Sequence, residues 1–243
     1  VISVAYDTGG FICENDMIPP TSRIAGQPVD VTGIAVSQNK PSVMAYCQTK
    51  DQYYGDGSSM YESLHFSFDG GQSWTAVRGS KNLGDRGSCA LSANGDYLYW
   101  IPSASGARYT ENVGTTLYVY KVENNSFQVT PKKYALSLES TTGVRVMCDT
   151  VNNSLVYISS DAGLSYSQDM GATFSTISDN TSDSLKRMTV VPGKEGEVWG
   201  AYGFGSNAGL LQYSVPEKSV VTCAKITGCE AVGFGKGISE TAY

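Results

Sequence analysis

The chain has 243 residues, of which 41% are hydrophobic and 16% charged, a balance typical of a folded chain with a real core. Its formal net charge of −6 argues against a nucleic-acid partner, because phosphate binding requires a basic surface. No apolar run approaches the roughly 18 residues that span a bilayer, so no membrane partner is expected. The 27 glycines and 16 tyrosines favour short strands joined by tight turns.

Short apolar or alternating segments, rather than helical periodicity, run along the chain. They are separated by turn signals rich in Asn, Gly, Asp and Pro. The predicted strands, in chain order, are 1–6, 31–36, 43–47, 64–68, 88–91, 97–101, 117–122, 144–147, 155–158, 188–191, 197–201, 210–213 and 231–236. This pattern predicts an all-β, antiparallel fold built from hairpins.

Two segments, 67–74 and 167–174, fit the pattern S-x-D-x-G-x-[ST]-[WF] of the Asp-box turn. In this turn the carboxylate accepts backbone N–H groups, the glycine supplies an unusual φ and the final aromatic ring packs between sheets. Asp69 and Asp169 are therefore expected to be structural, and Trp74 and Phe174 to be core residues.

The spacing of the two boxes suits two blades of roughly 40–50 residues each, with degenerate copies of the turn at 120–127 and 212–215. The prediction is a β-propeller of four-stranded antiparallel blades. Residues 1–243 are expected to form a single domain or fragment of four to five blades, an incomplete ring.

The chain has a single histidine, His65, in the alternating segment 64–67, where a structural role is expected. Catalytic triads and His-based zinc sites need imidazoles in groups or in a defined setting, so any chemistry falls to carboxylates. No metal and no cofactor are expected. The six cysteines show no metal-binding spacing. Cys89 and Cys148 fit buried free thiols, and Cys223 and Cys229 are close enough to close a small loop, a pairing that the sequence leaves open.

The segment 5–11 (Ala-Tyr-Asp-Thr-Gly-Gly-Phe) resembles the D-x-G-G-F segment that opens the second propeller of glycoside hydrolase family 74, the endo-xyloglucanases and related β-glucanases. Further matches keep the family's order along nearly the whole chain, at 67–74, 91–102, 190–199 and 231–236. The family has two seven-bladed propellers with a cleft between them. The resemblance therefore implies part of a seven-bladed ring, a secreted enzyme, a β-1,4-glucan or xyloglucan substrate and a second propeller as partner.

Residue by residue, the resemblance implies that Asp7 is the general acid of an inverting mechanism. Such a mechanism needs a second carboxylate, about 6.5–9.5 Å away, that activates water. Gly9 and Gly10 would let a polysaccharide pass close to the backbone. The family's general base lies in its first propeller, and no segment here corresponds to it. The chain is thus expected to supply one half of a two-carboxylate site, within a larger endo-β-1,4-glucanase. Read without the resemblance, Asp7 fits a residue that caps a turn.

Aromatic rings stack on the C–H faces of sugars, and a neutral glucan needs no basic groups. The preferred aromatic candidates for substrate contact lie in Gly-rich loops and are Tyr53, Tyr54, Tyr202 and Phe204. They are preferred to Trp100 and Trp199, which lie in predicted strands.

Two alternative functions share some of these sequence features. A non-catalytic propeller that binds β-glucan through the same aromatic residues would need no general base. Sialidases also carry Asp-boxes, but they need an R-I-P motif and an arginine triad. The segment 22–25 (Ser-Arg-Ile-Ala) lacks the proline, and the arginines, including Arg78, Arg86, Arg145 and Arg187, show no matching context.

Overall fold

The computed structural model describes residues 30–49, 61–103, 114–128, 130–138, 144–160, 163–178, 186–203, 209–223, 225–226, 228–229 and 231–234, and the backbone of 2–5 and 9–12. Within these residues the chain is all-β, apart from one 3₁₀ turn, η1 (Ser80–Asn82). Among the described helices none is long and apolar enough to cross a membrane.

Four consecutive antiparallel sheets make up most of the described chain, and we call them blades 1 to 4. Blade 1 consists of β3 (Gly33–Val36), β4 (Met44–Cys47), β5 (Leu64–Ser67) and β6 (Thr75–Ala76). Blade 2 consists of β7 (Ser88–Leu91), β8 (Tyr97–Ile101), β9 (Thr116–Glu123), β10 (Ser126–Phe127) and β11 (Lys132–Ala135). Blade 3 consists of β12 (Arg145–Cys148), β13 (Val156–Ser160), β14 (Gly163–Ser167) and β15 (Ser175–Ser178). Blade 4 consists of β16 (Lys186–Val190), β17 (Glu197–Tyr202), β18 (Gly209–Ser214) and β19 (Ser219–Thr222).

The strands of each blade lie side by side in chain order. Blade 2 departs from this only at its outer edge, where β10 and β11 both pair with β9. Before blade 1, β1 (Ile2–Ala5) and β2 (Gly9–Ile12) form a separate two-stranded hairpin.

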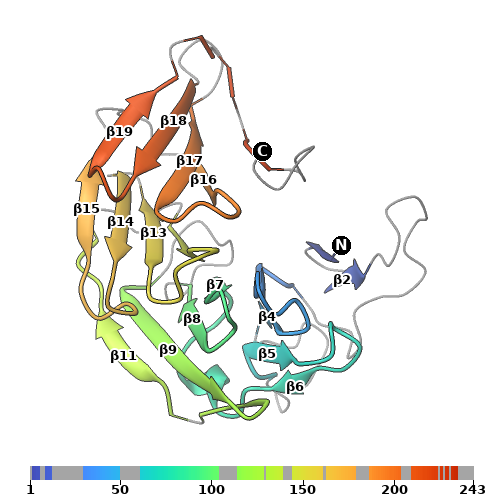
Figure 1. Ribbon diagram of the computed structural model, residues 1–243. Coiled ribbons are helices and arrows are strands. Elements are labelled where there is room, and N and C mark those ends of the chain that lie inside the picture. The colour runs from blue at the N-terminus through green and yellow to red at the C-terminus, as the bar shows by residue number, and fades with distance from the viewer. Residues whose placement is uncertain are drawn as a thin grey trace.

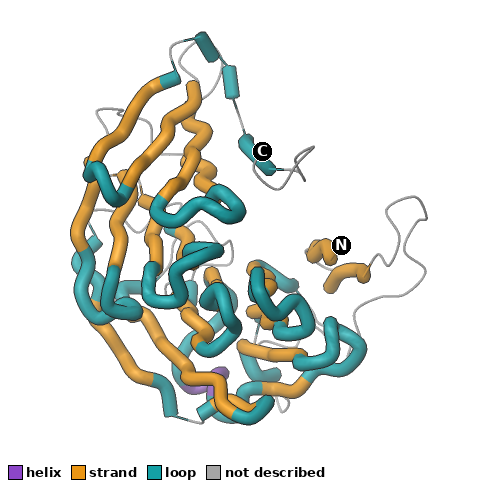
Figure 2. The backbone as a smooth tube through the Cα atoms, viewed as in Figure 1, coloured by secondary structure: helices purple, strands orange, loops and turns teal. Residues whose placement is uncertain are grey.

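The blades follow one another in an open arc (Figures 1 and 2). The first strands of the four blades, β3, β7, β12 and β16, line a common channel with a volume of about 680 Å³. Three four-stranded blades and one five-stranded blade, all antiparallel, lie in an arc around a channel. This is the architecture of an incomplete β-propeller, which the sequence predicted.

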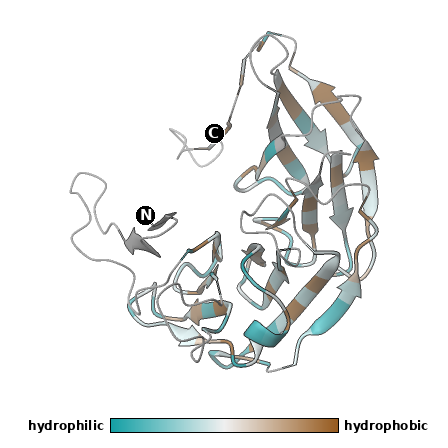
Figure 3. Cartoon of the chain, turned by 180° about the vertical axis from the view of Figure 1, so that it is seen from behind, coloured by the Kyte–Doolittle hydropathy of each residue, from teal (hydrophilic) through white to brown (hydrophobic). Residues whose placement is uncertain are grey.

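The core is divided among the interfaces between successive blades. One apolar cluster joins blades 1 and 2 around Trp100, a second joins blades 2 and 3 around Tyr99, and a third joins blades 3 and 4 around Tyr213. All three of these rings are fully buried. Brown apolar bands therefore alternate with polar ones along the strands in Figure 3. Each side chain buried in this way contributes about 1.5–3 kcal/mol, so adjacent blades stabilise one another.

The connections between first and second strands are hydrogen-bonded from each blade to the next. The bonds are Ser37 Oγ to the Ala93 carbonyl (2.8 Å), the Asn94 N–H to Asn153 Oδ1 (3.0 Å) and Asn152 Nδ2 to Glu195 Oε1 (2.7 Å). These connections therefore share one face of the arc, which we call the belt face. Because strands within a blade alternate in direction, the connections between second and third strands emerge on the opposite face, which we call the loop face.

The turns expected to close the blades lie where the sequence placed them, between third and fourth strands. At the degenerate copy in blade 2, Asn124 and Asn125 take φ values of 51° and 54°, the left-handed pair that a two-residue hairpin needs. One expectation was wrong. Residues 231–234 form no strand; instead the Phe234 ring packs edge-on against Trp199, with 6.1 Å between centroids. Cys223 and Cys229 are both free thiols, like Cys89 and Cys148.

Candidate functional site

The proposed site residues divide between described and undescribed parts of the chain. Asp7, Tyr53, Tyr54 and Phe204 lie outside the described residues. Gly9 and Gly10 lie in β2, and Tyr202 is the last residue of β17.

The hairpin of β1 and β2 flanks the candidate acid in sequence. Ala5 pairs with Gly9 and Val4 with Gly10, so the two strands are in register where β1 ends and β2 begins. Asp7 lies between them in the sequence. The two glycines leave the start of β2 without side chains, which permits close approach of another chain to its backbone.

Tyr202 is the candidate aromatic residue whose surroundings are described. It is half-buried and packs against the apolar cluster between blades 3 and 4. A Cβ placed on Gly209, its partner in β18, would lie 2.6 Å from the Tyr202 hydroxyl, so the ring occupies the space that the glycine leaves open. Tyr202 is thus held by its own blade, and its exposed part lies on the loop face.

The other aromatic candidates belong, in chain order, to corresponding connections of blades 1 and 4. Tyr53 and Tyr54 belong to the connection between β4 and β5, and Phe204 belongs to the connection between β17 and β18. Both are connections between second and third strands, which leave from the loop face.

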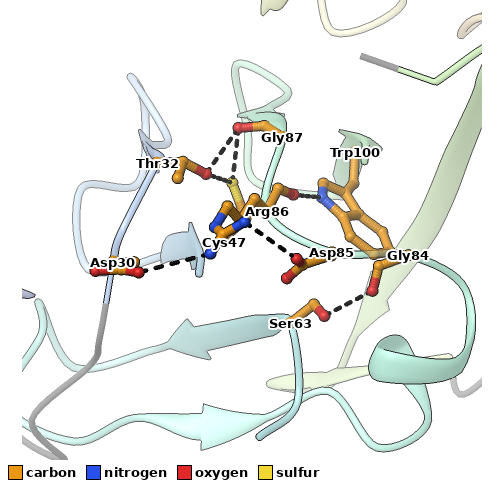
Figure 4. A network of polar contacts seen from close by, with 9 residues as sticks. All are labelled: Asp30, Thr32, Cys47, Ser63, Gly84, Asp85, Arg86, Gly87 and Trp100. Atoms are coloured by element: carbon orange, nitrogen blue, oxygen red, sulfur yellow. Dashed lines mark hydrogen bonds and ion pairs between the residues drawn. The ribbon is translucent and has the colours of Figure 1, made fainter. Parts of the chain in front are cut away.

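A buried polar network lies at the junction of blades 1 and 2 (Figure 4). Its centre is Arg86, which is 8% exposed and takes φ of 48° just before β7. The guanidinium lies 3.6 Å from an Asp30 carboxylate oxygen and 3.5 Å from one of Asp85. The Trp100 indole N–H donates to the Arg86 carbonyl at 2.7 Å. Because both carboxylates pair with the same buried guanidinium, Asp30 and Asp85 help to hold the junction of blades 1 and 2.

The same network holds the beginning of blade 2 against blade 1. The Gly87 carbonyl accepts from Thr32 Oγ1 at 3.0 Å and from the Cys47 thiol at 3.3 Å, while Ser63 Oγ donates to the Gly84 carbonyl at 2.8 Å. No local sequence pattern predicts this network, because Asp30 and Arg86 are far apart in sequence. Sequence analysis named Arg86 but did not assign it to this network.

The Asp-box carboxylates have the structural role predicted for them. Asp69 accepts from the backbone N–H and the hydroxyl of Ser73, and Asp169 accepts from the same two groups of Thr173. These hydroxyls are the main reason that the pKa of each carboxyl is lowered to about 2. Both turns lie between third and fourth strands, on the belt face. Trp74 and Phe174 pack half-buried against the apolar clusters.

Another buried carboxylate, Asp149, joins blades 3 and 4. It is 1% exposed and accepts from the Tyr157 hydroxyl at 2.6 Å, from the Gly196 N–H at 2.9 Å and from the N–H groups of Val151 and Asn152 at 2.8 Å each. All its hydrogen-bonding capacity is used by the fold. Asp149 therefore serves architecture rather than catalysis. No group of acidic, histidine or cysteine side chains suited to a metal ion occurs among the described residues.

The chain is similar in sequence and in fold to known xyloglucanases. No family model matches it. It is 27% identical over 253 residues to the xyloglucanase Xgh74A of Acetivibrio thermocellus, an alignment that covers 100% of this chain and 26% of the relative. A solved GH74 enzyme of Niastella koreensis is 26% identical with a TM-score of 0.73, over 100% of this chain and 31% of that one. The GH74 xyloglucanase of Xanthomonas campestris has the same TM-score at 17% identity over 100% of this chain and 32% of its own, which shows the shared fold.

These likenesses agree with the expected resemblance in both sequence and fold. The chain spans about a quarter of the length of the curated relative that it matches over its whole length. It is thus an incomplete β-propeller that resembles part of a GH74 xyloglucanase.

Proposed function

We propose that this chain is part of a glycoside hydrolase that acts on xyloglucan or a related β-1,4-glucan, as the second of two propellers. The observation that supports the proposal most strongly is the sequence match to a xyloglucanase along the whole chain. A GH74 enzyme also matches the fold over all four blades. Since such polysaccharides lie outside cells, the proposal includes secretion.

In this proposal Asp7 is the general acid. It donates its proton to the glycosidic oxygen while a second carboxylate, about 6.5–9.5 Å away, activates water on the opposite side of the sugar ring. Gly9 and Gly10 let the polysaccharide approach the hairpin backbone. Tyr53, Tyr54, Tyr202 and Phe204 offer rings to the sugar faces, because their connections leave from the loop face.

The described carboxylates named above support the assignment of the base to another polypeptide segment. Asp30 and Asp85 pair with Arg86, and Asp149 is fully hydrogen-bonded inside the fold. Asp69 and Asp169 hold turns on the belt face. None of these five is assigned to activate water, and the proposed partner is a second propeller that carries the base.

The same observation favours one other function, a β-glucan-binding module without turnover. Retardation of the 243-residue chain in gels that contain xyloglucan, combined with an assay for reducing ends, tests both. The proposal expects retardation of the chain and slow or no release of reducing ends by the chain alone. Release of reducing ends by any longer natural polypeptide that contains the chain identifies the enzyme, and its absence leaves the binding module. Absence of retardation on xyloglucan and on other β-glucans contradicts both.

A further inference from the structure

Two buried cysteines meet at the junction of blades 1 and 2. Cys47 is the last residue of β4 in blade 1 and is 0% exposed, and Cys89 lies in β7 of blade 2 and is 6% exposed. Both pack in the apolar cluster that joins these two blades. Neither thiol has a part in the proposed hydrolysis of xyloglucan.

The alternation of side chains along the two strands directs both thiols into this junction. Tyr46, the residue before Cys47, packs with Trp74 in a separate cluster of blade 1, so Cys47 leaves β4 on the side that faces blade 2. Ala90, the residue after Cys89, packs in the cluster between blades 2 and 3, so Cys89 leaves β7 on the side that faces blade 1. Each side chain therefore points toward the blade that carries the other.

The Cys47 sulfur lies against the backbone that leads into Cys89. Its thiol donates to the Gly87 carbonyl at 3.3 Å (Figure 4). A Cβ placed on Gly33 would lie 2.9 Å from Cys47 Sγ and 3.4 Å from the Cys89 nitrogen, so these two atoms are no farther apart than the sum of the two distances. Since the Cα atoms of a disulfide are about 4.4–6.8 Å apart, the two residues are close enough for their sulfur atoms to meet.

We propose that Cys47 and Cys89 form a disulfide when the folded chain meets a small-molecule disulfide as oxidant. One cysteine, as the thiolate, attacks the oxidant, forms a mixed disulfide and releases one thiol. The other cysteine then attacks the mixed disulfide and releases the second thiol. Two electrons and two protons thus pass from the cysteines to the oxidant, and one S–S bond forms as another breaks.

The channel gives the oxidant a route to the pair. Cys89 is among the described residues that line it, and Cys47 is not, so Cys89 is expected to attack first. The neighbouring Cys47 thiol and burial raise the pKa of Cys89, so little thiolate is present near pH 7 and the reaction should be faster at higher pH. The Gly87 carbonyl keeps a donor after the reaction, because Thr32 Oγ1 donates to it at 3.0 Å.

The bond would join the second strand of blade 1 covalently to the first strand of blade 2. Blade 1 is the first blade of the open arc and packs on blade 2 through one apolar cluster. Disulfides persist in oxidising compartments outside the cell, which agrees with the proposed secretion. The bond does not depend on any hydrolysis of xyloglucan.

Peptide mapping after oxidation tests the proposal. The folded chain is incubated with 2-hydroxyethyl disulfide at a pH of about 8.5, where an ordinary thiol is half ionised. Remaining thiols are then blocked with N-ethylmaleimide in urea, and the chain is digested with trypsin without reduction. Cleavage after Lys50, Arg86 and Arg108 places Cys47 and Cys89 in separate peptides. We expect these two peptides to be cross-linked and to separate on reduction, whereas oxidation of the urea-unfolded chain should give a mixture of pairings.

Urea unfolding and three variants assign the bond to this pair. Oxidation should raise the unfolding midpoint of the chain by about 1 M urea. Cys47→Ala and Cys89→Ala should lose both the cross-link and this rise. Cys148→Ala is the matched control and should keep both, because Cys148 lines the same channel but packs in the cluster between blades 2 and 3. Circular dichroism checks that each variant is folded.

Four results would overturn the proposal. They are two thiols that stay reduced in the oxidised folded chain, a mixed disulfide that remains on Cys89, a dominant cross-link to another cysteine, and a cross-linked chain whose unfolding midpoint is unchanged.

Discussion

Lowering the pH from 7 to 5 should destabilise this protein through one residue, His65. The imidazole is largely buried on β5 and stacks on Tyr46, with 4.8 Å between ring centroids and an interplanar angle of 11°. Its Nδ1 is buried and has no hydrogen-bond partner in the described structure. Burial lowers the pKa of His65 from 6.5 to about 4, because the charged form cannot be solvated there.

The sign and size of the effect follow from proton linkage. The unfolded chain takes up a proton on His65 below pH about 6.5, whereas the folded chain does so only near pH 4. The free energy of unfolding therefore falls as the pH falls through this window. At about 1.4 kcal/mol per pKa unit, the loss is about 2 kcal/mol at pH 5 and about 3 kcal/mol once both states are protonated.

Urea unfolding at several pH values between 7 and 5 measures this dependence. Because His65 is the single histidine in the chain, the window separates it from the carboxylates, which titrate mainly at lower pH. The control is His65→Phe, which keeps an aromatic ring on Tyr46 and cannot titrate. Its unfolding free energy should change by less than about 0.5 kcal/mol over the window. Equal pH dependence in both proteins would refute the reasoning.

Other predictions concern the turns and blade junctions. Asp69→Asn weakens the hydrogen bonds of an exposed turn, so chemical denaturation should show a loss of about 1 kcal/mol without a change in xyloglucan retardation; no loss would contradict the structural role. Gly87→Ala should destabilise the chain by about 2–4 kcal/mol in the same assay. The reason is that Gly87 has φ of +95° and an added Cβ would lie 2.0 Å from the Ile101 carbonyl oxygen. A variant as stable as the original chain would contradict the packing of blade 2.

Much of the fold could be predicted because the inner strands of each blade are buried and apolar. Strands such as β8 and β13 therefore stand out as short hydrophobic runs. Outer strands were missed: both residues of β6 are exposed, and β11 has three exposed residues of four, so neither shows an apolar pattern. β14 was missed for the opposite reason, since it buries serines as well as apolar residues and does not alternate.

The site could be predicted only in part. The hydrogen bonds of the Asp-box turns join residues that are close in sequence. The sequence pattern therefore predicts these bonds and identifies Asp69 and Asp169 as structural. Asp7 has no such local signature and rests on the resemblance alone. The Arg86 network depends on residues brought together by the packing of blades 1 and 2, and the sequence holds no short-range signal for such contacts.

The role of Asp7 is tested most directly by Asp7→Asn in the longest natural polypeptide that contains this chain and hydrolyses xyloglucan. The variant keeps the side-chain shape and removes the proton donor, so xyloglucan binding should persist while polysaccharide cleavage falls by about 10²–10⁴-fold. An aryl glycoside with a good leaving group should lose much less activity, because its departing phenolate needs little protonation. Equal slowing of both substrates, or no slowing of either, would contradict the assignment of Asp7 as the general acid.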